Sequence, residues 1–541
     1  MLRLFNWLDA VIFDLGRQLR WSFLPPLMVY FAAGISGLSA IVGTFYVKET
    51  LGLSASFLAG LAFWAGLPWA LKMPLGHLVD VIWRWKALLV YIGAALIAAS
   101  ILIMYALITA PDRMAQVMSL EAWYVVSVIL APLGYVTQDA VADAMSVEAV
   151  PRVDANGHEI GEAETKALHT TMQTLGRIAL ISGSVGVALV NIFMFDGVEE
   201  MVPAEKTAIY AQIYLIALMI PLISISGVIL ASWIKNRRKQ ELLRSGLAID
   251  EVNKIIHFQS EKTEVNPLYF IGGLAFVLLT LVVGILDVPF SQEIVFACSM
   301  GIVLFLMSQL IRELDRDKAM ALLGTAIIIF VFRAVPLPGP GATWFEIDVL
   351  KFDQQFISVL SLIASVLTLV GMVVLRPLMA RRSITYIVVL LTLVGGLLFL
   401  PNIGLYYGLH QWTAPMTGGV VDARFIALID TAIESPLGQI AMIPMLAWIA
   451  RNAPTHLKAT FFAVMASFTN LALSASSLLT KYLNQMFVVT REVRDRATSA
   501  IEVPADYSAL GWLLIAVAVV SVLAPLITIA VVQKTMLKTT D

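Results

Sequence analysis

The sequence predicts an all-α integral membrane protein made of two pseudo-symmetric six-helix bundles, with two further helices inserted between them. Three observations support this prediction. The 541 residues are 59% hydrophobic and 14% charged, with a mean hydropathy of +0.85, which is far from the composition of a soluble domain. Fourteen apolar segments are long enough to cross a bilayer. Finally, Met172 to Asn191 aligns with Met465 to Asn484 at a constant offset of 293 residues.

The aligned segments indicate an internal parallel repeat. MQTLGRIALISGSVGVALVN faces MASFTNLALSASSLLTKYLN, with the Met, an Ala-Leu pair and the final Asn in register, and Arg177 falls opposite Asn470. In membrane proteins such a repeat is typical of transporters whose two bundles move about a shared central cavity. The repeat therefore favours a transporter over a pore or an enzyme.

The fourteen predicted spans are arranged as six, two and six along the chain. A span needs about 20 apolar residues, because each helical residue rises about 1.5 Å and the hydrocarbon core is about 30 Å thick. The first six cover about 25 to 47, 55 to 75, 85 to 109, 122 to 146, 168 to 194 and 209 to 234. The inserted pair covers 267 to 286 and 293 to 311. The last six cover 319 to 335, 355 to 379, 383 to 400, 424 to 450, 458 to 488 and 508 to 533.

These spans divide the chain into predicted domains. Residues 1–22 carry apolar side chains at helical spacing among charged ones, which predicts an interfacial amphipathic helix, with a disordered tail as the alternative. The other predicted units are an N-terminal bundle at 23–234, a cytoplasmic linker at 235–266, an inserted hairpin at 267–317, a C-terminal bundle at 318–534 and a cytoplasmic tail at 535–541.

Lys and Arg residues determine the predicted orientation, since cytoplasmic loops are enriched in them. The linker alone carries Lys235, Arg237, Arg238, Lys239, Arg244, Lys254 and Lys262. Placing both termini in the cytoplasm puts this linker and most other basic residues inside. The predicted location is therefore a bacterial inner membrane, with both termini cytoplasmic.

Several other functions are disfavoured by composition. The net charge of -2 and the lack of a basic run with interleaved aromatics argue against nucleic-acid binding. The single Cys298 excludes an internal disulfide, and no histidine cluster or phosphate-binding loop suggests a metal, another cofactor or ATP. An aspartyl protease is a remote alternative, because Asp139 and Asp143 share one predicted helix and a catalytic dyad needs two facing elements. The prediction is therefore a protein without cofactors that is not an enzyme.

Charged residues inside the predicted spans are the strongest functional signal. Lys72, Asp143 and Arg177 are predicted at one depth, about 12 to 14 Å from the cytoplasmic face. A charge facing lipid at the bilayer centre costs about 2.5 to 3.5 kcal/mol, so burial between helices with pairing is expected.

Two pairs of acidic residues lie four apart within predicted spans. Asp139 and Asp143 share one helical face, as do Asp430 and Glu434 in the corresponding span of the second half. Like charges at this spacing repel, so one carboxyl of each pair can hold a proton in a low-dielectric cavity.

These residues make up the candidate binding site for substrate and ions. Asp139, Asp143, Asp430 and Glu434 are predicted to include a proton-coupling site, while Lys72 and Arg177 bind an anionic substrate or release the proton when it arrives. Asn470 joins the set because it occupies the position of Arg177 in the second repeat. The alternative is a closed ion-pair network of Lys72, Asp143 and Arg177 that only locks one conformation.

The end of the second predicted span reads Gly76-His77-Leu78-Val79-Asp80, followed by Arg84, Trp85 and Lys86. This stretch resembles the G-x-L-x-D-(x)-R/K loop motif of the major facilitator superfamily. The resemblance implies the major facilitator fold and a gating role for Gly76, Asp80, Arg84 and Lys86, which would latch neighbouring helix ends on the cytoplasmic side. Gly76 would let a helix approach closely. An ordinary solvated turn is the alternative interpretation.

Further stretches in both halves resemble one branch of that superfamily, the folate-biopterin transporter family. They are Pro68 to Gly76, Gln138 to Ala144, Gln439 to Pro444, Asn452 to Pro454 and Ala459 to Leu471. The resemblance does not extend to the amphipathic start, the 267–311 hairpin or the loop from Pro151 to Lys166. The chain also has Ala453-Pro454 and Lys458-Ala459 where the family usually has Cys-Pro and a Gly-Glu pair.

The prediction is a secondary active transporter that works by alternating access, coupled to protons, for a pterin- or folate-like organic anion. One alternative is a muropeptide permease of the same superfamily, which also has fourteen spans. Another is a non-transporting assembly or scaffold protein, for which the 267–311 hairpin would be the contact surface for another protein. Intramembrane charges weigh against a scaffold, because a scaffold does not need them.

Overall fold

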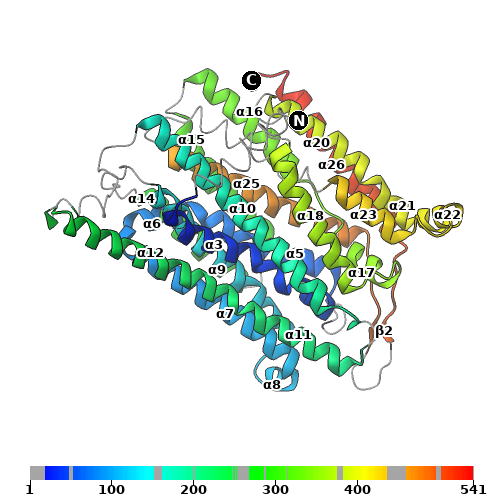
Figure 1. The fold of residues 1–541 in the computed structure, drawn as a ribbon. Helices are drawn as coiled ribbons and strands as arrows, with labels where there is room; N and C mark the ends of the chain where they lie inside the picture. The colour runs from blue at the N-terminus through cyan, green and yellow to red at the C-terminus, as the bar shows by residue number, and fades with distance from the viewer. Residues whose placement is uncertain are drawn as a thin grey trace, which may run out of the picture.

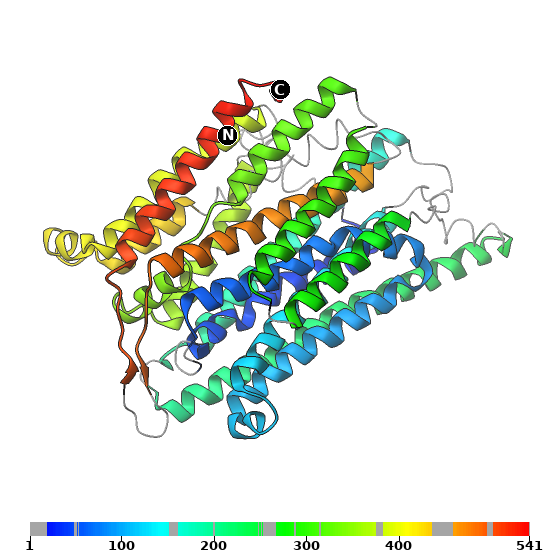
Figure 2. The same cartoon turned by 180° about the vertical axis from the view of Figure 1, so that it is seen from behind.

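The computed structural model describes most of the chain. The described residues are 19–47, 51, 53–150, 161–198, 201–246, 248–249, 252, 267–285, 288–312, 315–374, 382–434, 458–494 and 501–539. Long helices run roughly side by side through the molecule (Figures 1 and 2). Within the described residues only β1 (Val493–Arg494) and β2 (Ile501–Val503) form strands, and they pair antiparallel. The predicted all-α class is confirmed. The predicted amphipathic helix lies almost wholly outside the described residues.

The described part of the N-terminal half contains ten α-helices. They are α3 (Leu24–Gly34), α4 (Ala40–Tyr46), α5 (Ala55–Gly66), α6 (Lys72–Val81), α7 (Lys86–Thr109), α8 (Pro111–Ala115), α9 (Leu120–Ala149), α10 (Glu162–Met194), α11 (Pro203–Ala217) and α12 (Met219–Arg244). Short 3₁₀ segments, η2 (Trp21–Phe23), η3 (Ile35–Ser39), η5 (Leu67–Leu71) and η6 (Trp83–Trp85), lie among them.

The remaining described helices form the inserted hairpin and the C-terminal half. The hairpin consists of α14 (Pro267–Ile285) and α15 (Ser291–Ile311). The C-terminal half consists of α16 (Arg316–Arg333), α17 (Pro340–Asp348), α18 (Gln354–Val374), α20 (Ile384–Leu398), α21 (Leu400–Tyr406), α22 (Leu409–Met416), α23 (Ala423–Glu434), α25 (Lys458–Met486) and α26 (Leu510–Val532).

Each predicted span contains helix in its described part. Nine helices of the described chain are long and apolar enough to cross a bilayer, so the count of fourteen spans stays a prediction. Several spans are interrupted. The first contains η3, beyond Gly34, where the backbone of α3 touches that of α10 so closely that a Cβ at Gly34 would collide with the carbonyl of Leu180. The second contains η5, which begins at Leu67 with Pro68 in its first turn.

The two halves contact each other through symmetry-related helices. The main contacts between the halves pair α10 with α18 and α25 with α5. The 293-residue offset of the repeat places α10 on α25 and carries α5 onto the first turns of α18. These two contacts are therefore equivalent, as two copies of one bundle facing each other would produce.

The inserted hairpin packs against both halves. Helix α15 contacts α25 and α5, and α14 contacts α6. At the start of α15, Gln292 donates to the carbonyl of Gly60 on α5 at 3.2 Å, and Lys481 on α25 donates to the Gln292 side chain at 2.9 Å. The hairpin is thus a lateral bridge between the halves.

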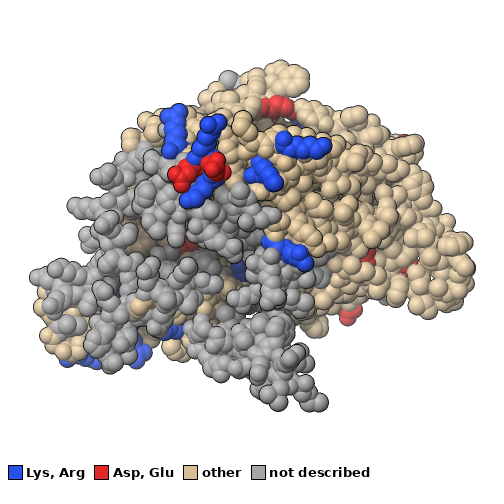
Figure 3. Space-filling view, turned by 90° about the horizontal axis from the view of Figure 1, so that it is seen from above, with Lys and Arg blue, Asp and Glu red and all other residues tan. Residues whose placement is uncertain are grey.

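The molecule has two distinct ends, which we call the basic end and the strand end. The basic end holds the end of α12 at Arg244 and the start of α16 at Arg316, whereas the strand end holds α8, α22 and the two strands (Figure 1). Exposed Arg312, Arg316 and Lys318 lie at the basic end, and Lys and Arg side chains are visible on the surface viewed from above (Figure 3). The basic end is the one that the sequence predicts to face the cytoplasm.

Candidate functional site

The N-terminal half holds a cluster of charged side chains at the junction of three helices. Lys72 is the first residue of α6, directly after the Pro68-containing segment η5. Its Nζ lies 2.6 Å from Asp139 Oδ2 and 2.8 Å from Asp143 Oδ2. Tyr30 of α3 donates its hydroxyl to Asp143 Oδ1 at 2.7 Å. We call Lys72, Asp139, Asp143 and Tyr30 the lysine site.

The lysine site is sheltered but still accessible. The side chains of Lys72 and Asp139 are 23% and 14% exposed, while that of Asp143 is 46% exposed. One ammonium group faces two carboxylates, so the site carries an excess negative charge unless a proton or a second cation joins it. An arrangement of this kind is suited to exchange protons or to bind an ionic ligand.

The structure brings together three of the predicted site residues. Asp139 and Asp143 share one face of α9, as their spacing predicts, and both pair with Lys72. Tyr30 was missed, since a tyrosine in an apolar span is more often a packing residue. Its hydroxyl nevertheless donates a hydrogen bond to Asp143 Oδ1, whereas Lys72 contacts the other oxygen, Oδ2.

Arg177 lies apart from this cluster. Its side chain on α10 is exposed, and it makes no ion pair within the described part of the chain. Its charge still acts on Asp139 and also on Arg333, at the end of α16 in the other half. Two arginines from different halves are therefore close enough to interact. Arg333 was missed because it ends an apolar segment and resembles an interfacial residue in the sequence.

Asn470 connects the halves near the lysine site. Its Nδ2 on α25 donates to the carbonyl of Trp69 in η5 at 3.2 Å. Trp69 lies three residues before Lys72, so movement of α25 would be felt at the start of α6. Asn470 is the repeat counterpart of Arg177, yet it binds backbone, whereas Arg177 makes no hydrogen bond to the backbone of the described residues.

The second predicted acidic pair has a different setting. Asp430 on α23 is 8% exposed and accepts a hydrogen bond from Asn402 Nδ2 of α21 at 3.0 Å. The side chain of Glu434 lies outside the described residues. The charge of Asp430 also acts on Glu346 of α17: burial, together with this charge, raises the pKa of Glu346 to about 7.

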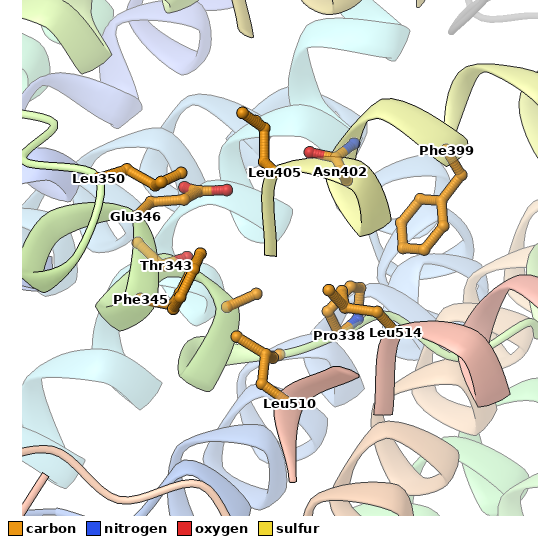
Figure 4. A pocket seen from close by; sticks show the side chains of 12 residues that line it. Pro338, Thr343, Phe345, Glu346, Leu350, Phe399, Asn402, Leu405, Leu510 and Leu514 are labelled. Atoms are coloured by element: carbon orange, nitrogen blue, oxygen red, sulfur yellow. The ribbon is translucent and has the colours of Figure 1, made fainter. Parts of the chain in front are cut away.

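Glu346 and Asn402 extend toward a common pocket of about 240 Å³ at the strand end (Figure 4). Helices α17, α21 and α26 contribute most of its lining. Apart from Glu346, Asn402 and Thr343, its side chains are apolar: Pro338, Ala342, Phe345, Leu350, Phe399, Leu405, Leu510 and Leu514. We call this cavity the glutamate pocket. Glu346 was missed because it follows a Pro-Gly-rich stretch that resembles a solvated loop.

One predicted gating residue, Lys86, forms an ion pair with an acid that the sequence did not single out. Buried Lys86 lies 2.6 Å from Glu148 of α9, and Lys235 of α12 lies 3.4 Å from the same carboxylate. Burial alone would raise the pKa of Glu148, but the two lysines lower it. Glu148 was missed because it ends a helix, where acidic residues are common.

The other gating residues give less information. At Gly76 an added Cβ would meet no described atom within 4 Å, so the expected close helix approach is not seen there. The side chains of Asp80 and Arg84 lie outside the described residues, as do the stretches Gln439 to Pro444 and Asn452 to Pro454.

The halves are joined at the strand end. Arg491 donates to the carbonyl of Val47 at 2.9 Å, and Gln354 donates to the hydroxyl of Tyr210 at 2.8 Å. Gln355 donates to Asp196 at 3.2 Å. Each bond connects an N-terminal residue with a C-terminal one, so the described strand end is closed by bonds between the halves.

Comparisons with known proteins agree with this architecture. The model of the BT1 family matches residues 33–541. The chain is 22% identical over 477 residues to the folate-biopterin transporter of Synechocystis sp., a match that covers 87% of this chain and 76% of that protein.

Solved structures share the fold at low sequence identity. A POT family transporter in complex with 5-aminolevulinic acid has a TM-score of 0.59 at 13% identity, covering 97% of this chain and 96% of that one. A peptide transporter POT in complex with alafosfalin has a TM-score of 0.56 at 14% identity, covering 95% and 94%. The nucleoside transporter NupG has a TM-score of 0.52 at 12% identity, covering 94% and 99%. These neighbours confirm the predicted major facilitator fold.

Proposed function

The chain belongs to the BT1 family and is a membrane transporter, and we propose that it carries a pterin- or folate-like organic anion by alternating access, coupled to protons. The lysine site is the observation on which this proposal depends. Two carboxylates and one ammonium group are held together at the junction of α3, α6 and α9. The name of the Synechocystis relative supports the choice of cargo class.

The charge balance of the lysine site provides a coupling mechanism. An anionic cargo that engages Lys72 competes with Asp139 and Asp143 for the same ammonium group. A carboxylate that loses its cation binds a proton more readily, because a buried charge is unfavourable without a partner. Binding of the anion and of the proton therefore favour each other, which is the requirement for symport.

Arg177 and Arg333 provide a second point of attraction for an anion. They come from α10 and α16, in different halves, and their charges interact. A cargo carboxylate placed between them would relieve this repulsion and contact both halves at once. A ligand that contacts both halves is able to bias their relative positions, as alternating access requires.

Transport by purified protein in liposomes tests the proposal. Labelled folate, a pterin and an anhydro-muropeptide are offered under an inward proton gradient, with and without an ionophore that dissipates it. We expect uphill accumulation of folate or pterin that depends on the gradient. Selective accumulation of the muropeptide would instead support the permease alternative, and no transport or binding of any of the three would overturn the proposal.

Asp143→Asn tests the coupling step separately. The variant should lose uphill accumulation but keep exchange of labelled for unlabelled cargo, since exchange needs no net proton movement. Glu121→Gln is the matched control, because Glu121 is an exposed acid on the same helix. Unchanged accumulation by Asp143→Asn would remove Asp143 from the coupling site.

A further inference from the structure

The glutamate pocket combines a carboxyl group with an apolar lining. Glu346 and Asn402 are its polar residues together with Thr343, and aromatic and leucine side chains surround them (Figure 4). A carboxylate in such a setting is poorly solvated in its charged form. The pocket still gives the carboxyl group a path by which water can deliver or remove a proton.

The groups that face Glu346 from the neighbouring helices are few. Asn402 lines the pocket together with Glu346 and donates to Asp430 of α23 at 3.0 Å, so the Asp430 carboxyl lies directly behind the pocket lining, and its charge acts on Glu346. No charged side chain is present on α5 or α26. Helix α21 contributes Tyr406, whose hydroxyl donates to the carbonyls of Tyr507 and Ser508. On its own helix, Asp348 accepts a hydrogen bond from Tyr507 at 2.5 Å.

The nearby cations at the strand end have other contacts. Arg491 lies over the ring of Trp344 at 5.3 Å and donates to the carbonyl of Val47. Arg424 on α23 is 2.6 Å from Asp353. Within the described residues, Glu346 itself makes no ion pair.

We propose that Glu346 and Asp430 hold one proton between them and that the glutamate pocket is the proton-binding site of the C-terminal half. Two carboxyl groups that interact in a low-dielectric setting cannot both be ionised without a large cost. Asn402 donates its amide hydrogen to Asp430, which favours the ionised form of that carboxyl and leaves the proton on Glu346.

The same proton has a consequence for the strand end. Glu346 lies on α17 and Asp430 on α23, so loss of the proton introduces a repulsion between these helices. At the strand end, hydrogen bonds join the N-terminal and C-terminal halves. The link between this proton and transport rests on the proposed function, whereas the binding of the proton does not.

Infrared spectroscopy of the purified full-length protein, without cargo, tests the proton site directly. A protonated carboxyl group has a C=O stretching band that disappears on ionisation. We expect the wild-type protein to lose such a band between about pH 6 and pH 8, one unit on either side of neutrality. Glu346→Gln should lack this component, while Asp112→Asn, which removes an exposed acid at the same end, should retain it.

A second variant covers the case in which Glu346→Gln does not fold. Asp430→Asn removes the charge that acts on Glu346, so the midpoint of the same band should fall, by up to about one pH unit because burial is the larger cause of the raised pKa. A band that persists unchanged in Glu346→Gln, or a midpoint that does not move in Asp430→Asn, would overturn the proposal. A Glu346→Gln variant that loses the infrared band and still shows normal gradient-driven uptake would confirm the proton site. That result would also show that transport does not depend on it.

Discussion

The lysine site contains two carboxyl groups, whereas the glutamate pocket contains one, Glu346, on which the charge of Asp430 acts. The two halves stabilise these acids by different means. In the N-terminal half, Lys72 lies between Asp139 and Asp143 at 2.6 and 2.8 Å. In the C-terminal half, Asn402 binds Asp430, and the charge of Asp430 acts on partly buried Glu346, which makes no ion pair in the described chain. Two copies of one fold can therefore stabilise their acidic residues differently, by a lysine in one half and by a bound proton in the other.

Replacement of Lys72 should lower the stability of the protein more than any other single substitution at the two sites. Lys72→Gln leaves Asp139 and Asp143 facing each other without their cation. Loss of one partner of a fully buried ion pair costs about 3 to 5 kcal/mol, and the partial exposure of this site makes that range an upper bound. We expect a marked fall in the melting temperature of the detergent-purified protein near neutral pH.

A compensating change provides the control for this prediction. In Lys72→Gln combined with Asp139→Asn and Asp143→Asn, no uncompensated charge remains, so most of the lost stability should return. If the triple variant melts as early as Lys72→Gln, packing of the lysine stem and not its charge holds the site.

The glutamate pocket should show the opposite dependence on charge. Burial and Asp430 raise the pKa of Glu346 from 4.5 to about 7, so its contribution to stability is fully present below pH 4.5 and is lost as the pH rises through 7. The change amounts to at most about 3 kcal/mol, at about 1.4 kcal/mol per pH unit. Glu346→Gln should therefore melt at a higher temperature than the wild type at pH 8 and at a similar temperature at pH 4.5.

The sequence predicts the residues of the lysine site better than those of the glutamate pocket. Asp139 and Asp143 are recognisable because helical periodicity brings residues four apart onto one face, and Lys72 because a charge in an apolar segment needs a partner. The same spacing in the second half suggested Glu434 as the partner of Asp430. That pair stays a prediction, because the side chain of Glu434 lies outside the described residues. The charge of Asp430 also acts on Glu346, 84 residues earlier in the chain, an interaction that only tertiary packing creates.

The fold was predictable for a related reason. Hydropathy and the internal repeat each depend on long segments, so they indicate helices and two halves without detailed packing. The major facilitator fold was implied by the resemblance of the loop motif from Gly76 to Lys86. The interruptions η3 and η5 could not be placed this way, because apolar 3₁₀ and α-helical turns have the same hydropathy. These interruptions matter for function, since η5 determines where α6 begins and thus where Lys72 lies.

A smaller effect is expected from the hydroxyl that supports Asp143. Tyr30→Phe removes a 2.7 Å hydrogen bond to a charged group, and such bonds contribute about 1.5 to 3 kcal/mol. The variant should melt earlier than the wild type by less than Lys72→Gln does. Tyr105→Phe is the control, because Tyr105 is a partly buried tyrosine whose hydroxyl makes no hydrogen bond to the described residues. Equal melting of the two variants would show that the lysine site does not need Tyr30.

The smallest effect should come from Glu148 at the basic end, where this carboxylate meets Lys86 and Lys235. Lys86 and Lys235 lower the pKa of Glu148 despite its burial, so its contribution is present above pH 4.5 and is lost as the pH falls further. Its side chain is 35% exposed, which limits the contribution to about 1 kcal/mol. Glu148→Gln should reduce the change of melting temperature with pH in the acid range. Glu346→Gln should reduce that change near neutral pH. If Glu148→Gln changed the pH dependence of the melting temperature near neutral pH instead, two assignments would be wrong. The acid dependence could not belong to lysine-paired Glu148, and the neutral dependence could not belong to proton-bound Glu346.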